Sequence, residues 1–171
     1  MILKLIGSAL IVFSCTLFGY TFKGKCLIRI KELENMLLCV EIAEKEISMF
    51  LSNVVDIFNK IIVYATDYNK VIFTKALNAH QNSDGEVFSK VWANTLNTVN
   101  NDIYTKEEIS TFKKFGILFS VGDINIQNGN ISELKTSLIK LINKAKENEN
   151  KLCVSSKIGI YTGIVISVFL L

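Results

Sequence analysis

The sequence predicts an all-α protein: a compact bundle of about six helices flanked by an N-terminal and a C-terminal transmembrane helix. Two observations predict the bundle. Proline is absent from the 171 residues, and apolar residues recur at the three- and four-residue spacing that is typical of helices with one buried face. The membrane helices are predicted because an uncharged apolar segment occupies each end of the chain. We therefore expect residues 3–22 and 158–171 to be transmembrane helices and residues 23–157 to form a cytoplasmic helical-bundle domain.

The two apolar segments differ in length. Residues 5–22 carry no charge, and their number is close to the roughly 20 residues that span a bilayer. No small-residue cleavage pattern closes this segment, which favours an uncleaved helix over a signal peptide. Residues 158–171 would cover only about 21 Å of the ~30 Å hydrocarbon core. A segment that begins at Leu152 is long enough to span the hydrocarbon core if Lys157 extends its amine toward the headgroups.

Basic residues gather just inside both apolar segments. Because Lys and Arg near membrane ends favour the cytoplasmic side, they predict a cytoplasmic domain tied to one membrane at both ends. They also suit an anionic lipid surface. The net charge is only +3, and its excess base is membrane-proximal, which argues against a nucleic-acid partner. These membrane-proximal cations are Lys23, Lys25, Arg29, Lys31, Lys144, Lys146, Lys151 and Lys157.

The first three helices of the bundle each have a local signal. An apolar stripe from Ile30 to Leu51, interrupted by Glu44, predicts a long first helix that can continue the N-terminal membrane helix. Asn53, with Ser52 before it, is expected to begin the second helix, and Asp67 to cap the third. The polar stretch of residues 80–85 then predicts a loop.

Two capping-box patterns predict the next two helices, because each places a Glu three residues after a Ser or Thr. They are Ser83 with Glu86 and Thr105 with Glu108. A turn rich in glycine and asparagine is expected at residues 122–130, before a last helix that starts near Ile131. The single tryptophan, Trp92, is expected to be a core anchor, because Phe88, Val91 and Leu96 lie at helical spacing from it; an interface role is the second choice.

The sequence carries no motif of a catalytic or cofactor-binding site. It has no phosphate-binding loop, dinucleotide fingerprint, zinc-protease motif or nucleophile elbow. Its four cysteines form no C-x-x-C pair, and its one histidine, His80, falls in the expected solvated loop. We therefore expect no catalytic residue, no cofactor and no metal site, and reduced thiols in the cytoplasm.

Several segments, taken in order, resemble the stage III sporulation protein AB family. The resemblance extends over essentially the whole chain, although Phe50-Leu51-Ser52-Asn53 stands where that family usually has a Thr-Pro-Leu-like turn. The segments that carry it are Leu3-Lys4-Leu5-Ile6-Gly7 before an apolar span, Ala43-Glu44-Lys45-Glu46-Ile47, Val91-Trp92, and Phe115-Gly116-Ile117-Leu118-Phe119-Ser120-Val121-Gly122-Asp123 followed by Gln127.

The resemblance implies a non-enzymatic adaptor or platform component of the mother-cell-to-forespore channel complex, in the mother-cell membrane around the forespore. Its soluble domain would be similar to the cytoplasmic domain of type II secretion F proteins. The implied partners are a cytoplasmic ATPase resembling stage III sporulation protein AA and other membrane proteins of the same channel complex. The residues expected at a partner-binding surface are Glu44, Glu46, Gly122, Asp123 and Gln127.

Two alternatives stay open. Asp123 and Gln127 could instead brace the turn between the fifth and sixth helices. The protein could also be a helical membrane sensor or regulator that binds a ligand or partner between its helices.

Overall fold

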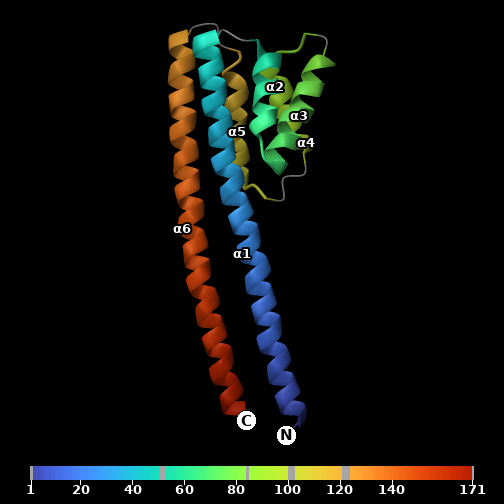
Figure 1. Ribbon diagram of the computed structural model, residues 1–171, viewed down its shortest axis with the longest axis vertical. Coiled ribbons are helices and arrows are strands. Elements are labelled where there is room, and N and C mark those ends of the chain that lie inside the picture. The colour runs from blue at the N-terminus through green and yellow to red at the C-terminus, as the bar shows by residue number, and fades with distance from the viewer. Residues whose placement is uncertain (1, 51–52, 84, 100–102, 121–123, 171) are drawn as a thin grey trace. The chain divides into compact units, whose positions relative to one another are not determined.

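The structure is a computed structural model, which describes most of the chain. The backbone is described for residues 2–50, 53–83, 85–99, 103–120 and 124–170. Within these, side chains are described for residues 7, 14, 24–48, 53–83, 85–99, 103–120 and 126–151. This part of the chain contains six α-helices and no strand (Figure 1). The prediction of an all-α chain with about six helices is confirmed.

The six helices are joined by short connections, and a π-helical turn, Glu46–Phe50, follows the first of them. The chain divides into two compact units. Unit 1 comprises Met1–Ile30 and Lys144–Leu171, and unit 2 comprises Lys31–Asn143. The helices are α1 (Ile2–Lys45), α2 (Val54–Tyr64), α3 (Asp67–Gln81), α4 (Phe88–Thr98), α5 (Lys106–Ile117) and α6 (Ile124–Leu170).

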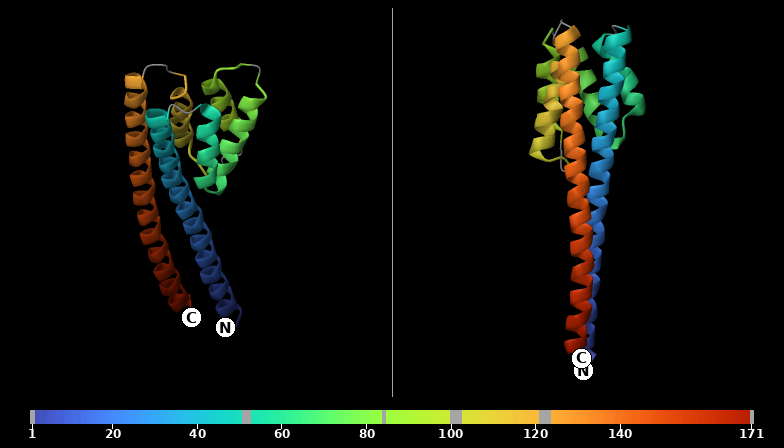
Figure 2. Two further views of the ribbon diagram at one scale, coloured as in Figure 1. Left: turned by 45° about the horizontal axis from the view of Figure 1, so that its top comes forward. Right: turned by 90° about the vertical axis from the view of Figure 1, so that its left-hand side faces the viewer.

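Unit 1 contains the outer parts of the two long helices, each of which runs without a break in its backbone (Figure 2). The expectation that the first helix continues the N-terminal apolar segment is thereby confirmed. Within the part of the chain that the structure describes, no helix is long and apolar enough to cross a membrane. Most side chains of the two terminal apolar segments lie outside the described residues, so the transmembrane helices stay a prediction.

Unit 2 is built around a cluster of aromatic side chains. Its helices α2, α3, α4 and α5 pack in chain order, each against the next (Figure 1). The Phe58 ring lies edge-on to Phe73 and Phe88, with centroids 5.3 and 4.9 Å away. Trp92 packs against Phe58, Phe73 and Phe115 at 5.9, 5.3 and 5.3 Å. The edge-to-face contacts among them, such as those of Phe58 with Phe73 and Phe88, add to the free energy gained from burial.

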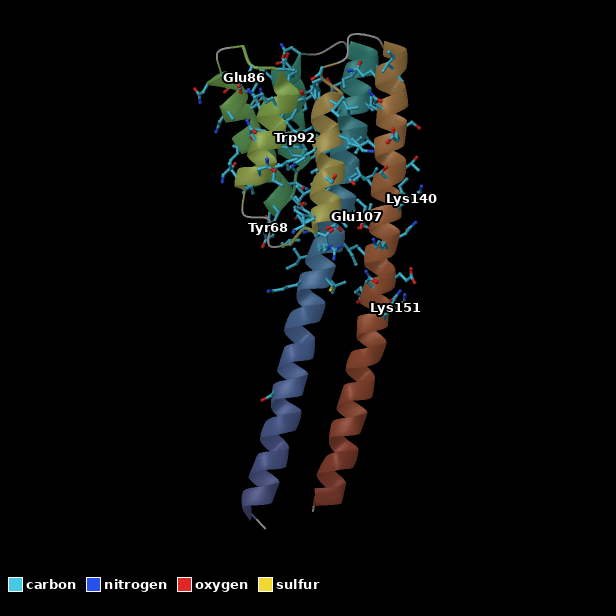
Figure 3. The ribbon with its side chains drawn as sticks, turned by 180° about the vertical axis from the view of Figure 1, so that it is seen from behind. Tyr68, Glu86, Trp92, Glu107, Lys140 and Lys151 are labelled. Carbon is cyan, nitrogen blue, oxygen red and sulfur yellow. The ribbon has the colours of Figure 1, made fainter. Side chains whose placement is uncertain are left out.

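Trp92 is fully buried in this cluster, as predicted (Figure 3). Its indole Nε1–H donates to the Phe112 carbonyl at 2.7 Å, which satisfies the one polar group of the ring. Phe88, Val91 and Leu96 are buried with it.

Helix α5 approaches α4 closely at a glycine. A Cβ atom placed on Gly116 would lie 2.8 Å from Trp92 Cδ1 and 2.9 Å from Trp92 Cβ. Both distances are shorter than van der Waals contact, so any larger residue at this position must displace the indole.

Two of the predicted helix starts are confirmed. Asn53 caps α2, and its Oδ1 accepts from the Asp56 N–H at 2.9 Å. At α5 the Thr105 Oγ1 accepts from the Glu108 N–H at 3.3 Å, and Glu108 Oε2 accepts from the Thr105 N–H at 2.7 Å. This reciprocal pair is the capping box that the sequence predicted.

Two other predicted starts are wrong. Thr66 is the N-cap of α3, and Asp67 is already helical. The Ser83–Glu86 capping box does not form, because α4 begins later, at Phe88. Ser83 Oγ instead donates to the His80 carbonyl at 2.7 Å. Glu86 accepts from Lys90 at 2.7 Å.

The expected loop around His80 and the expected turn before Ile131 are also partly wrong. Helix α3 extends through Gln81, so His80 lies in its last turn, half-buried, with its ring edge-on to Phe88 at 5.3 Å. Helix α6 begins at Ile124, so residues 124–130 are helical. In both places the tertiary contacts override the weak helix propensity of asparagine and glycine.

Candidate functional site

Three of the five residues predicted to bind a partner have described side chains. They are Glu44 on α1, Glu46 at the start of the π-helical turn, and Gln127, the fourth residue of α6. Gly122 and Asp123 lie outside the described residues, so their role stays a prediction. Each of the three described residues makes a contact between two segments of unit 2.

Glu44 connects α1 with α6. Its carboxylate accepts from Lys135 Nζ at 2.8 Å, and 39% of its side chain is exposed. This hydrogen bond, with Glu44 and Glu41 as neighbouring charges, raises the pKa of Lys135 above its ordinary value. A partly exposed ion pair contributes at most about 1 kcal/mol to stability, so Glu44 remains able to exchange Lys135 for another cation.

Glu46 connects the π-helical turn with α2. Its carboxylate accepts from Lys60 Nζ at 2.6 Å. Only 8% of the Glu46 side chain is exposed, against 52% of Lys60. A partner that approaches this pair therefore meets the Lys60 ammonium before it meets Glu46. Single π-helical turns occur often at functional sites, so the end of α1 stays a candidate for the partner-binding surface.

Gln127 connects α6 with α5. Its Nε2 donates to the Leu118 carbonyl at 2.5 Å, and Leu118 follows directly on the end of α5. Carbonyls at helix ends lack partners within the helix, so this bond satisfies one of them. The contact fits the bracing role that was the alternative for this residue.

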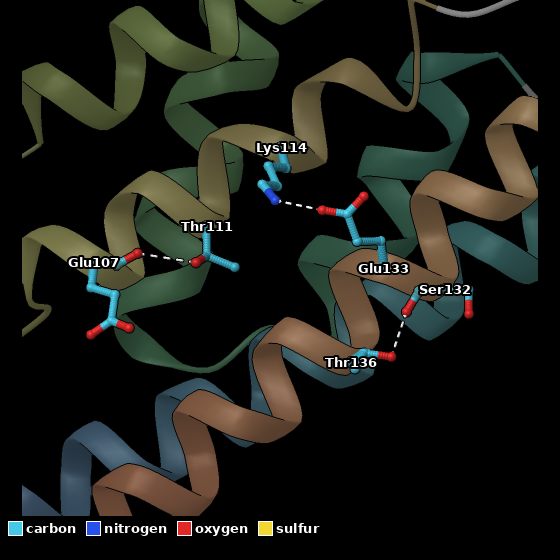
Figure 4. A network of polar contacts seen from close by, with 6 residues as sticks. All are labelled: Glu107, Thr111, Lys114, Ser132, Glu133 and Thr136. Atoms are coloured by element: carbon cyan, nitrogen blue, oxygen red, sulfur yellow. Dashed lines mark hydrogen bonds and ion pairs between the residues drawn. The ribbon is translucent and has the colours of Figure 1, made fainter.

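The exposed surface next to this contact is polar. Lys114 of α5 pairs with Glu133 of α6 at 2.7 Å, and Thr111 and Thr136 donate to backbone carbonyls one turn earlier in their helices (Figure 4). All of these are ordinary surface contacts of small energy.

The structure reveals a buried polar cluster that the sequence did not indicate. Glu32 and Asn35 of α1, Asn69 of α3, and Tyr104 just before α5 are 1, 8, 0 and 8% exposed. Asn69 is the central residue. Its N–H donates to Glu32 Oε2 at 3.1 Å, and its Nδ2 donates to the Glu32 carbonyl at 2.8 Å and to Asn35 Oδ1 at 3.1 Å. Its Oδ1 accepts from the Tyr104 hydroxyl at 2.8 Å. We call these four residues the Asn69 network.

The Asn69 network also fixes the turn between α2 and α3. Asn35 Nδ2 donates to the Tyr64 carbonyl at 2.9 Å, and Asn35 Oδ1 accepts from the Thr66 N–H at 3.0 Å. One side chain of α1 thereby satisfies backbone groups at the end of α2 and at the start of α3. Buried polar networks that are satisfied in this way specify a unique packing.

Burial and nearby carboxylates keep the Tyr104 hydroxyl and the Cys39 thiol protonated. Burial first, and then the charges of Glu32 and Glu108, raise the pKa of Tyr104 above its ordinary value. Burial first, and then Glu32, raises the pKa of Cys39 to about 12. The Tyr104 hydroxyl therefore remains a donor near neutral pH. The Cys39 thiol remains unreactive, since only thiolates are good nucleophiles.

One signal in the sequence could have suggested these residues. Asn69 precedes the core residues Ile72 and Phe73 by three and four positions, and Asn35 precedes the buried Cys39 by four. A polar residue at these spacings lies on the buried face of its helix. Which polar residues of α1, α3 and the segment before α5 meet, however, depends on how these segments pack together.

Among the side chains that the structure describes, no group of three or more His, Cys, Asp or Glu residues is placed to hold a metal ion.

Comparison with known proteins agrees with the resemblance in the sequence. No curated protein and no solved structure matches the chain. The family described as Stage III sporulation protein AB matches residues 4–171, which is nearly the whole chain. The chain therefore belongs to the stage III sporulation protein AB family.

Proposed function

We propose that this sporulation protein is a non-enzymatic, membrane-anchored adaptor of the mother-cell-to-forespore channel complex. In this role it couples a cytoplasmic ATPase to the membrane subunits of the complex. One observation carries the proposal: α1 and α6 each run as a single helix from unit 2 into an apolar terminal segment. The eight cations beside these segments support a cytoplasmic unit 2.

The coupling in this proposal is mechanical. The sequence has no phosphate-binding loop, so the energy comes from the partner ATPase. Within unit 2, the Glu44–Lys135 pair connects α1 with α6, and the Asn69 network connects α1 with α3 and with the segment before α5. A push on α2 to α5 is thereby passed to the two helices that lead to the proposed anchors.

The topology can be tested by cysteine labelling. Gly85 is exposed in the connection between α3 and α4, so Gly85→Cys in a chain without its native cysteines gives an accessible thiol. In a non-sporulating host that carries the chain in its plasma membrane, we expect an impermeant maleimide to label Gly85→Cys only after the cells are permeabilised. Leu171→Cys is the control, and it should be labelled in the intact cells of this host. Labelling of Gly85→Cys in intact cells would contradict the proposed orientation.

The partner can be tested by calorimetry with the purified full chain and the ATPase. Glu44→Gln and Asp123→Ala examine the predicted surface, and Glu133→Gln is a matched control because Glu133 forms an exposed ion pair with Lys114. We expect the control to bind normally. Asp123→Ala with a normal melting point and lost binding indicates direct contact, whereas a lowered melting point indicates bracing. If the unaltered chain does not bind the ATPase at all, the direct adaptor role is wrong.

The alternative of a ligand-binding sensor requires polar groups that face a ligand. The buried polar side chains of the Asn69 network bond to one another instead, which favours the adaptor.

A further inference from the structure

The first turn of α3, which includes the Tyr68 labelled in Figure 3, is capped from another helix. Thr66 is the N-cap residue, yet its side chain makes no cap hydrogen bond. Within the described part of the chain, the Thr66 hydroxyl oxygen is buried and has no hydrogen-bond partner. The N–H of Asn69, three residues further on, donates to Glu32 Oε2 of α1 at 3.1 Å. A carboxylate of α1 therefore occupies the place that an N-cap side chain normally takes.

The backbone of Thr66 already has the conformation of a capping residue. Its φ and ψ angles are −85° and 170°. Those of Thr105, whose hydroxyl caps α5 by accepting from the N–H three residues later, are −77° and 162°. Asn53, which caps α2 in the same way, has angles of −72° and 163°. Rotation of the Thr66 side chain between its staggered positions therefore directs Oγ1 at the Asn69 N–H once Glu32 has released it.

We propose that the first turn of α3 exchanges between two caps, the carboxylate of Glu32 and the hydroxyl of Thr66. Glu32 holds the Asn69 N–H in the structure because a carboxylate forms a stronger hydrogen bond than a hydroxyl. When Glu32 turns away, Thr66 takes its place, and no buried donor is left without a partner. Because such an unpaired donor costs more free energy than a hydrogen bond contributes, the reserve cap makes the contact between α1 and α3 reversible.

The other bonds between α1 and the α2–α3 turn lie nearer to the solvent. The side chain of Asn35 bonds to the Tyr64 carbonyl and to the Thr66 N–H, and both bonds are only partly buried. Tyr64 is 61% exposed. Water can therefore replace these two bonds when α1 shifts. The bond from the Asn69 N–H is buried, and the Thr66 hydroxyl supplies its replacement.

This exchange goes beyond the proposed function, and it suits the mechanical coupling described there. Helix α1 leads toward one of the proposed anchors, and α3 belongs to the helices that receive the push. A contact that opens and closes between them sets how firmly the push is passed on. That use rests on the proposed function, whereas the exchange itself is a property of unit 2 alone.

A double-mutant cycle in urea unfolding of the full, detergent-solubilised chain tests the exchange. Thr66→Val replaces the hydroxyl by a methyl group of similar size. In the unaltered chain this hydroxyl is unbonded, so Thr66→Val should leave the ratio of folded to unfolded protein unchanged or raise it. In the Glu32→Ala background the hydroxyl is the cap, so the same change should lower the ratio about fivefold.

Thr66→Ser is the matched control, because it keeps the hydroxyl, and it should lower the ratio much less than Thr66→Val in the Glu32→Ala background. Hydrogen exchange of the Asn69 amide, followed by NMR, gives a second measurement. We expect this amide to stay protected in Glu32→Ala and to exchange about fivefold faster when Thr66→Val is added.

Equal effects of Thr66→Val in the two backgrounds overturn the proposal, and so does an Asn69 amide that is already unprotected in Glu32→Ala. If Glu32→Ala does not fold, Glu32→Met provides the background instead, because it fills the space and carries no carboxylate. Equal effects of Thr66→Val there overturn the proposal in the same way. The experiment needs neither a membrane nor the ATPase, so its outcome is independent of the proposed function.

Discussion

Replacing Gly116 by alanine should destabilise the protein, although the same change in a helix usually stabilises it. An added methyl would lie 2.8, 2.9 and 3.0 Å from three atoms of Trp92. The indole cannot easily withdraw, because it is fully buried and its Nε1 is bonded to the Phe112 carbonyl. Overpacking of this kind costs about 1–3 kcal/mol. Alanine regains roughly 0.5–1 kcal/mol through its higher helix propensity, so we expect a net loss of up to about 2.5 kcal/mol.

Gly129→Ala is the matched control for this experiment. Gly129 lies inside α6, and nothing stands within 4 Å of a Cβ built on it. This variant should gain about 0.5–1 kcal/mol. Urea unfolding of the detergent-solubilised chain can be followed by Trp92, which is the only tryptophan. If Gly116→Ala is as stable as Gly129→Ala, the close approach of α4 and α5 is not as described.

Three further predictions concern the core and the helix starts. Trp92→Ala should lower the free energy of unfolding by about 3–5 kcal/mol, because it empties the aromatic core; a variant with an unchanged melting point would contradict this. Thr105→Ala removes one half of the capping box and should cost about 0.5–2 kcal/mol in urea unfolding, whereas Thr105→Ser should cost much less. The pKa values of Tyr104 and Cys39 are raised in the folded state. Their contribution to the free energy of unfolding is therefore complete while the pH stays below their ordinary pKa values, about 8.5 for a thiol and 10 for a phenol. That stability is lost as the pH rises further. The urea midpoint should therefore fall above about pH 9, and Tyr104→Phe should make this fall smaller.

The sequence predicted those parts of the fold that depend on local signals. The Thr105–Glu108 capping box and the Asn53 cap formed as expected, because both ends of each interaction lie within one helical turn. The Ser83–Glu86 pattern was identical in spacing and yet wrong. Helix α3 continues to Gln81, and Ser83 is used to close its end. A local pattern cannot tell which of two neighbouring helices will use it.

The candidate site was less predictable than the fold. Glu44, Glu46 and Gln127 were identified from the sequence, but the residues they contact, Lys135, Lys60 and Leu118, lie 91, 14 and 9 positions away. The Asn69 network was missed for the same reason, since its bonds join positions 34 to 37 apart. Hydrophobic periodicity shows which face of a helix is buried. It does not show which polar residues on two faces will meet.

The central place of Asn69 has a consequence for how related sequences can vary. Its side chain bonds to α1 through Glu32 and Asn35, and to the segment before α5 through Tyr104. Loss of any one member leaves buried polar groups without partners, which costs roughly 1–3 kcal/mol for each neutral group and more for a carboxylate. Replacement of the whole set by apolar residues does not avoid that cost, because the Tyr64 carbonyl and the Thr66 N–H would lose the Asn35 side chain that pairs with them. In an alignment of the family, these four positions should therefore stay polar together, with few apolar residues at any one of them.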